Sequence, residues 1–217
     1  MKIDKILCVT LDTGDTGRFG ETRRAFEEYG VFVDRWPGEI VVDRDDPRLD
    51  GWRLKDYANG LRRCGIGLAH AALHRKQKEE GWGNVLVLQD DARPHPKFLD
   101  GYAKLVDFDE PFDMFFLGYW DRKFTAKKTK NSGVAAVRGL VLGAHAYVAS
   151  GKFAGELAAF HGNKPWDEFM ADLTGFGRSF AVVPACVRQR DNYSTHLGAY
   201  RDMTETAVTC EEGWLKL

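Results

Sequence analysis

The chain has 217 residues, of which 44% are hydrophobic and 29% are charged, and its formal net charge is −1. This length and composition suit one globular domain, and the near-neutral charge excludes a global field that would draw the protein onto nucleic acid or an anionic membrane. No apolar run approaches the roughly 20 residues of a membrane span, and the stretch before Asp12 is too short for a secretory signal. We therefore expect a cytoplasmic protein without a transmembrane segment.

In the first half of the chain, apolar runs alternate with helical patterns. A strand is predicted where apolar residues follow one another, and a helix where they recur every three or four positions before a glycine. The predicted strands here are 5–11, 31–36 and 85–88, and the predicted helices are 20–29, 61–83 and 96–106. A stretch rich in Pro, Gly and Asp, residues 37–59, is predicted to be a long loop.

The second half continues this alternation but adds a predicted hairpin and two polar segments. The expected elements are a strand at 112–120, a hairpin of two strands at 134–150, helices at 152–162 and 165–173, and a last strand at 179–187. We expect residues 121–133 to form a mobile basic loop and residues 189–217 to form an irregular tail.

Strands that alternate with helices predict an α/β protein whose mostly parallel sheet is flanked by helices on both faces. The expected hairpin makes this sheet mixed. No composition shift marks a domain boundary, so residues 1–217 are expected to form one domain.

Two adjacent carboxylates, Asp90 and Asp91, follow the aliphatic strand 85–88. Turns favour Asp, and a solvated carboxylate pair costs little, so one interpretation is a strand that simply reaches water. The other interpretation is a divalent cation, which turns the repulsion between the carboxylates into attraction. In open α/β sheets, ligands bind at the carboxyl ends of strands, and this position favours the cation.

The stretch CGIGLAHAALHRKQKEEGWGNVLVLQDDARPHPKF resembles glycosyltransferase family 25, the lipopolysaccharide-type galactosyltransferases and their collagen-modifying relatives. That family has a G-C-A-L-S-H segment, a helix, an aliphatic strand and then E-D-D-A. Further similar segments follow the family's order along most of the chain: CVTLDTGDTGR, DMFFLGYW, HAYVAS, PWDEF and VRQRDNYS. Each motif is weak alone, but the ordered set is fairly specific.

The resemblance implies that this domain has a GT-A-like, Rossmann-related fold, and it implies a nucleotide-sugar donor, a divalent metal ion and inversion at the anomeric carbon. It places the nucleotide base and ribose of the donor at Thr10, Leu11 and Asp12, and the donor diphosphate at Arg18. The guanidinium of an arginine suits a diphosphate, although Arg18 is equally compatible with a plain surface position.

For the metal, the resemblance implies Asp91 as the principal ligand, Asp90 as its partner or as a ribose contact, and His196 as a late ligand. A solvent-exposed loop is the plainer interpretation of His196. Gln89 stands where the family has Glu; its amide can still bond a ribose hydroxyl but adds no charge. Thr13 stands where Arg is usual. Thr195 stands where Asp is usual, and the loss of that carboxylate leaves the third protein ligand of the metal open.

The general base of an inverting reaction takes the proton of the acceptor hydroxyl. By resemblance this base is Asp167, with Glu168 beside it as the reserve candidate. The same two residues suit a helix start, where acids are favoured by the helix dipole alone, and the sequence does not separate the two interpretations.

His70 and His74 are four residues apart on one predicted helix, as in some zinc sites. The segment lacks the Glu of H-E-x-x-H and a third ligand, so we reject a zinc site. We expect His70 to be a hydrogen-bonded packing residue that lines the active site.

Three functions remain open. The first is transfer of a hexose from a UDP-sugar to a hydroxyl of a glycan or lipopolysaccharide, with Mn²⁺ or Mg²⁺ as cofactor. The second is transfer to a hydroxymethylated pyrimidine in modified DNA, which the basic segment 121–133 suggests and the near-neutral charge disfavours. The third is a degenerate, non-catalytic module that binds sugar nucleotides, which Gln89 and Thr195 favour.

Overall fold

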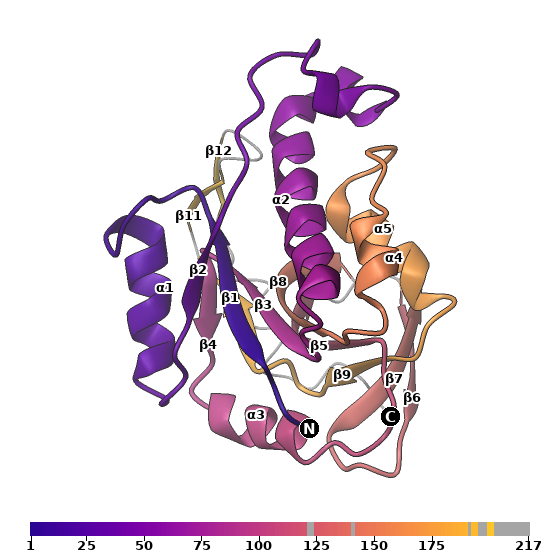
Figure 1. The fold of residues 1–217 in the computed structure, drawn as a ribbon. Coiled ribbons are helices and arrows are strands. Elements are labelled where there is room, and N and C mark those ends of the chain that lie inside the picture. The colour runs from indigo at the N-terminus through magenta and orange to yellow at the C-terminus, as the bar shows by residue number, and fades with distance from the viewer. Residues whose placement is uncertain (121–123, 140–141, 191, 195–198, 202–217) are drawn as a thin grey trace.

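The structure is a computed structural model that describes residues 1–120, 124–139, 142–190, 192–194 and 199–201 (Figure 1). Besides two 3₁₀ turns, Pro47–Leu49 and Leu54–Asp56, it contains five α-helices and twelve strands in the described part. In chain order these are β1 (Lys5–Thr10), α1 (Gly17–Glu27), β2 (Asp34–Pro37), α2 (Gly60–Glu79), β3 (Val85–Gln89), β4 (Ala92–Pro94), α3 (Phe98–Val106), β5 (Met114–Trp120), β6 (Phe124–Lys128), β7 (Val134–Gly139), β8 (Leu142–Ala149), α4 (Ala154–Ala158), α5 (Trp166–Thr174), β9 (Ser179–Val182), β10 (Val187–Gln189), β11 (Asn192–Ser194) and β12 (Ala199–Arg201).

Eight strands form one sheet in the order β2-β1-β3-β8-β5-β9-β7-β6. The pairs β1–β2, β1–β3 and β5–β9 are parallel, and both neighbours of β8 are antiparallel to it. Strand β7 is antiparallel to β9 and to β6. Only β7 and β8 of these eight described strands therefore run against the other six, although four of the seven neighbouring pairs are antiparallel. This confirms the predicted mixed α/β sheet.

Helices cover both faces of the sheet, and each face has its own core (Figure 1). Strand β3 supplies Val85 and Val87 to the core beneath α2 and α5, and Leu86 and Leu88 to the core beneath α1 and α3. Because side chains alternate along a strand, burial on both faces requires the continuous apolar run VLVL. Within the described part, no helix is both long and apolar enough to cross a bilayer.

The predicted hairpin at 134–150 is wrong. Strands β7 and β8 both form, but β7 pairs with β6 and β9, whereas β8 pairs with β3 and β5. Four consecutive residues of β8, Ala146 to Ala149, are fully buried. A strand that is apolar on both faces needs neighbours and cover on every side, which the centre of the sheet supplies and a solvent-facing hairpin does not.

Two other segments contain more structure than the sequence indicates. The predicted basic loop 121–133 includes the edge strand β6, whose exposed Lys127 and Lys128 protect an open sheet edge from pairing with another chain. Residues 121–123 lie outside the described part. The predicted tail 189–217 contains the short pair β11–β12, and the predicted strand 179–187 is divided into β9 and β10, which join different sheets.

Glycine at position 67 allows helix α2 to approach the chain after α4. A Cβ atom added to Gly67 would lie 2.0 Å from a ring carbon of Phe160, whereas one added to Gly155 would meet only the end of Lys78, at 3.5 Å. We expect Gly67→Ala to lower the free energy of unfolding by about 1–3 kcal/mol through overpacking. Gly155→Ala is the control and should leave stability unchanged or raise it slightly, since Ala favours helix. Thermal unfolding of both variants measures this, and equal melting temperatures would contradict it.

Candidate functional site

The polar residues predicted to bind a ligand meet where β1 and β3 end. These two parallel strands are neighbours with Val9 opposite Gln89, so the next residues, Thr10 and Asp90, lie side by side. The Thr10 hydroxyl donates a hydrogen bond of 2.8 Å to Oδ2 of Asp90. Because β2 and β3 flank β1 on opposite sides, the chain reverses its winding direction here, and such switch points are where α/β sheets bind ligands.

Asp12 connects the end of β1 to the start of α1. Its Oδ2 accepts a hydrogen bond of 2.9 Å from the backbone N–H of Phe19, and its own N–H donates to the Thr10 hydroxyl at 3.1 Å. Gly17 makes this close approach possible, because its φ is +68° and an added Cβ atom would lie 2.8 Å from the Asp12 carboxylate. The neighbouring Leu11 is 47% exposed and presents apolar surface beside the site.

Arg18, in the first turn of α1, lies against the carboxylate pair. Its guanidinium is 2.7 Å from Oδ1 of Asp90 and 3.6 Å from Oδ2 of Asp91. The predicted role of Arg18 was a contact with the donor diphosphate; the structure places it at the same edge of the sheet, where it neutralises the acidic residues. One guanidinium therefore partly offsets the mutual repulsion of two carboxylates.

Burial raises the pKa of Asp90 to about 6. The Arg18 guanidinium and the Thr10 hydroxyl lower this pKa, and the neighbouring Asp91 raises it. Removal of the carboxylate from water is thus the largest effect, and attraction to Arg18 compensates for it only in part.

Asp91 has an acceptor atom without a donor. The residue is only 7% exposed; its Oδ2 accepts a hydrogen bond from the side-chain amide of Gln189, whereas Oδ1 is buried without a hydrogen-bond partner. The Oε1 atom of the same Gln189 is likewise buried and unpaired. Unpaired buried oxygens are costly, and carboxylate and amide oxygens are the ligands that Mg²⁺ and Mn²⁺ prefer. These residues fit a divalent cation.

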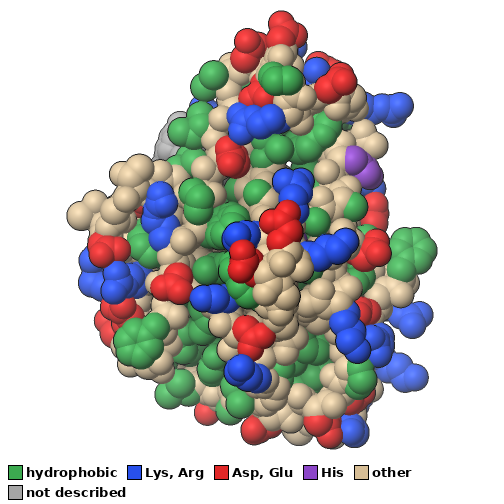
Figure 2. Space-filling view, viewed as in Figure 1, with side chains coloured by type: hydrophobic (Ala, Val, Ile, Leu, Met, Phe, Trp, Pro, Cys, Tyr) green, Lys and Arg blue, Asp and Glu red, His purple; other side chains and the backbone are tan. Residues whose placement is uncertain are grey.

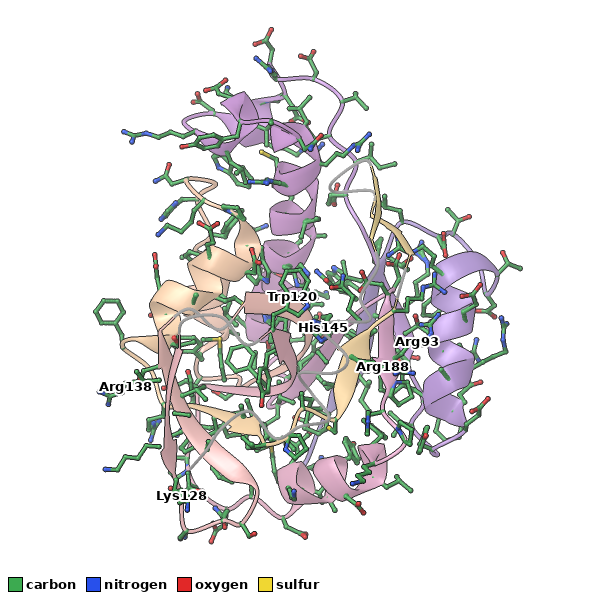
Figure 3. All side chains as sticks on the ribbon, turned by 180° about the vertical axis from the view of Figure 1, so that it is seen from behind. Arg93, Trp120, Lys128, Arg138, His145 and Arg188 are labelled. Carbon is green, nitrogen blue, oxygen red and sulfur yellow. The ribbon has the colours of Figure 1, made fainter. Side chains whose placement is uncertain are left out.

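His145, in β8, is a residue near this edge that the sequence analysis missed. It is 2% exposed, and its imidazole lies over two glycines: an added Cβ would be 2.4 Å from Nε2 at Gly118 and 3.0 Å from Nδ1 at Gly143. Figure 3 shows His145 beside Trp120, at the end of the central strands. Burial lowers the pKa of His145, and the negative charge of Asp91 raises it. The sequence signal that could have pointed to His145 is the glycine in each of two apolar segments, FFLGYW and VLGAHAY, because a glycine leaves room for the ring.

Among the described residues, no group of three or more His, Cys, Asp and Glu side chains could by itself hold a metal ion. If the two carboxylates held a cation here, its remaining ligands would be phosphates and water, as is usual for Mg²⁺. The predicted ligand His196 lies outside the described residues.

Asp167 lies in the first turn of α5, and its carboxylate accepts hydrogen bonds from backbone N–H groups of that turn and of Gly143. Gly143 is near the start of β8, an antiparallel strand, so this contact lies at the edge where β3 and β5 end. Burial raises the pKa of Asp167, and these backbone hydrogen bonds and Arg63 lower it. Glu168 is exposed. Asp167 thus has the backbone contacts of a helix start and one further contact, with the Gly143 N–H, at that edge of the sheet.

His70 and His74 belong to a fully buried hydrogen-bonded chain. The Tyr147 hydroxyl lies 3.0 Å from Nδ1 of His70 and 2.9 Å from Nε2 of His74. Both imidazoles stack on the indole of Trp166, the residue before Asp167. Nε2 of His70 is 3.5 Å from the amide nitrogen of Gln89. The predicted packing role of His70 beside the site agrees with this geometry.

An open cavity of about 600 Å³ lies elsewhere, at the amino-terminal ends of β3 and β5. The described residues that line it include Trp82, Ser150 and Arg178 and none of the predicted site residues. On the face seen in Figure 2, acidic and basic side chains are interspersed, in agreement with the near-neutral net charge.

Comparisons with known proteins find a weak similarity of fold between this chain and solved structures. No family model matches the chain, and no curated protein matches its sequence. Among solved structures, the chain is similar to the crystal structure of A197 from STIV, with 10% identity and a TM-score of 0.37 over 82% of this chain and 80% of that one. It is also similar to a glycosyltransferase involved in the glycosylation of the major capsid of PBCV-1, with 12% identity and a TM-score of 0.37. That match covers 70% of this chain and 62% of the other, less than two thirds of its length. Membership of family 25 stays a prediction.

The buried histidines should make the protein sensitive to acid. Burial lowers the pKa to about 3 for His70 and to about 4 for His74, against about 6.5 in an unfolded chain. The unfolded chain therefore binds protons that the folded protein cannot, so this stability is complete above about pH 6.5 and falls as the pH is lowered.

Urea unfolding between pH 7.5 and 5 measures this loss, which is at most about 1.4 kcal/mol per pH unit for each histidine. His74→Asn should reduce the slope of the unfolding free energy against pH by the contribution of one proton. The control His161→Gln, which changes an exposed histidine, should keep the wild-type slope. An unchanged slope for His74→Asn would contradict the prediction.

Proposed function

We propose that the protein is a metal-dependent, inverting glycosyltransferase that moves a hexose from a UDP-sugar to a hydroxyl of a glycan or lipopolysaccharide. The observation that carries this proposal is Asp91, whose buried Oδ1 has no hydrogen-bond partner, beside Asp90 at the carboxyl end of a central strand. An oxygen in that state, at the switch point of the sheet, is suited to a cation that a diphosphate also binds.

The residues around the pair suit the parts of a nucleotide sugar. Exposed Leu11 offers an apolar surface for the base, and Thr10 and Gln89 offer polar groups for the ribose. Arg18, already at this edge, is within the region where the diphosphate would lie. A divalent ion held by Asp91 and Asp90 would neutralise the charge that develops on the departing diphosphate.

Asp167 is the proposed general base. The acceptor oxygen attacks the anomeric carbon, the bond from that carbon to the diphosphate oxygen breaks, and the carboxylate takes the hydroxyl proton. Burial that raises the pKa of Asp167 makes it a better proton acceptor than an exposed Asp. Glu168 is exposed and remains the reserve candidate.

The metal bridge is tested by thermal unfolding with UDP and Mn²⁺, separately and together. UDP at 100 times its dissociation constant should stabilise the protein by about 2.7 kcal/mol, and only when the metal is present. Asp91→Asn should lose this stabilisation while it keeps the fold, because a neutral amide binds a hard cation poorly. The matched control is Asp100→Asn, an exposed position in α3. Equal stabilisation with and without metal would refute the bridge, and preference for another nucleotide would refute the uridine assignment.

Asp167→Asn separates the catalytic interpretation from the structural one. If Asp167 is the base, the variant should bind donor and metal normally but turn over about 10² to 10⁴ times more slowly. If the residue only starts the helix, Asn should serve nearly as well, since both are accepted at such positions. Turnover, donor affinity and melting temperature are measured together, with Glu168→Gln expected to be milder. Retained turnover in Asp167→Asn would remove the base assignment.

A further inference from the structure

The buried chain of hydrogen bonds that includes His70 and His74 has two different ends. At one end, the side-chain amide nitrogen of Gln77 donates to two backbone carbonyls, at 2.7 Å to Gly83 and 3.1 Å to Ala149. At the other end, Gln89 reaches the candidate site. His74, Tyr147 and His70 connect the two, and all three are fully buried.

The two carbonyls determine the direction of every hydrogen bond in this chain. A carbonyl only accepts, so Gln77 must turn its NH₂ group toward them and its Oε1 toward Nδ1 of His74, 2.8 Å away. Nδ1 of His74 must then carry the hydrogen, which leaves Nε2 as an acceptor for the Tyr147 hydroxyl.

The same logic continues to the site. The Tyr147 hydroxyl has used its hydrogen, so its oxygen must accept from Nδ1–H of His70. Nε2 of His70 is then an acceptor, and the group that faces it from position 89 must be a donor. The Gln89 amide satisfies this with its NH₂ group, over the longest step of the chain, 3.5 Å.

The hydrogen bonds of this chain cannot run in the opposite direction. Reversal would turn Oε1 of Gln77 toward the carbonyls of Gly83 and Ala149, and three acceptor oxygens would then lie together with no hydrogen between them. Protonation of the imidazoles would remove the acceptors that the chain needs. Burial keeps both histidines neutral by lowering the pKa to about 3 in His70 and about 4 in His74.

We infer that the carbonyls of Gly83 and Ala149, acting through Gln77, His74, Tyr147 and His70, orient the Gln89 amide so that its Oε1 faces the candidate site. Gln89 is then a specificity-determining residue that accepts a hydrogen bond from a hydroxyl of the nucleotide sugar, on the ribose or on the hexose. The choice of ligand rests on the proposed function; the orientation does not.

The same orientation favours Gln over Glu at position 89, where the resemblance to family 25 predicts Glu. An ionised carboxylate has no hydrogen to donate, so it would face the lone pair of His70 Nε2. Under this inference, Gln89 fits the buried hydrogen bonds of the interior and is not by itself a sign of a degenerate site.

The first experiment needs no ligand. Nitrogen-15 NMR of the folded protein at pH 7.5 distinguishes the two tautomers of each histidine. Both His70 and His74 should carry their hydrogen on Nδ1. A hydrogen on Nε2 of His70 would overturn the inference.

The second experiment is a double-mutant cycle between the ends and the middle of the chain. Gln89→Glu should lower the melting temperature at pH 7.5, because an ionised carboxylate would face the lone pair of His70 Nε2 with no hydrogen between them.

Tyr147→Phe should relieve this deficit, because His70 is then free to place its hydrogen on Nε2 and donate to the carboxylate. We expect a coupling of about tenfold in the unfolding constant. Tyr119→Phe is the control, since it removes a different buried tyrosine hydroxyl, one that bonds the Val182 carbonyl. Additive effects of Gln89→Glu and Tyr147→Phe would overturn the inference.

The third experiment identifies the hydroxyl. UDP-glucose and UDP-galactose are compared with analogues that lack one ribose or one hexose hydroxyl. Loss of the hydroxyl that meets Gln89 should weaken binding to the wild type about three- to tenfold and should not weaken binding to Gln89→Met further. If every analogue loses equally in both proteins, the specificity role is overturned. If no nucleotide binds while the tautomers are as expected, the proposed function fails and the orientation of the amide stands.

Discussion

Two negative charges at the end of a strand that is buried on both faces are the constraint on which this site depends. Asp90 and Asp91 cannot be hydrated as an exposed pair would be, so other elements must supply compensation. Thr10 from β1, Arg18 from α1 and Gln189 from β10 all converge on the pair. Segments that are far apart in the sequence are thereby held at one edge of the sheet. None of them reaches Oδ1 of Asp91, which makes this oxygen the candidate ligand for a cation.

The local parts of this arrangement could be predicted from the sequence, because they follow from short-range patterns. Four aliphatic residues before Asp90 identify a strand buried on both faces, and the carboxyl end of such a strand is where ligands bind. The neighbours of β7 and β8 in the sheet could not be predicted, because each of these two strands is locally compatible with pairing to the other in a hairpin. Only the competition among all strands for the centre of the sheet assigns β8 to the place between β3 and β5.

The partners of the site residues were also beyond local patterns. Arg18 could be expected near a phosphate, but its ion pair with Asp90 depends on the position of α1 against β3. His145 was missed because its significance rests on two glycines in different strands that leave room for the ring. The motif resemblance predicted Asp167 as the base, but the contact of Asp167 with the N–H of Gly143 depends on tertiary packing.

The position of β8 has a consequence for how the protein reaches its folded state. Strands β3 and β5 are complete by residue 120, but they are not neighbours of each other; both wait for β8, which is made last of the three. Until residues 142–149 insert, a nascent chain leaves unpaired the apolar edges of β3 and β5 that face β8, and the other edge of β5 waits for β9 (Ser179–Val182). Such edges are templates for association with other chains. These pairings are distant in the sequence, a topology whose loop-closure entropy slows folding, so the nascent chain is exposed to aggregation until β8 and β9 have been made.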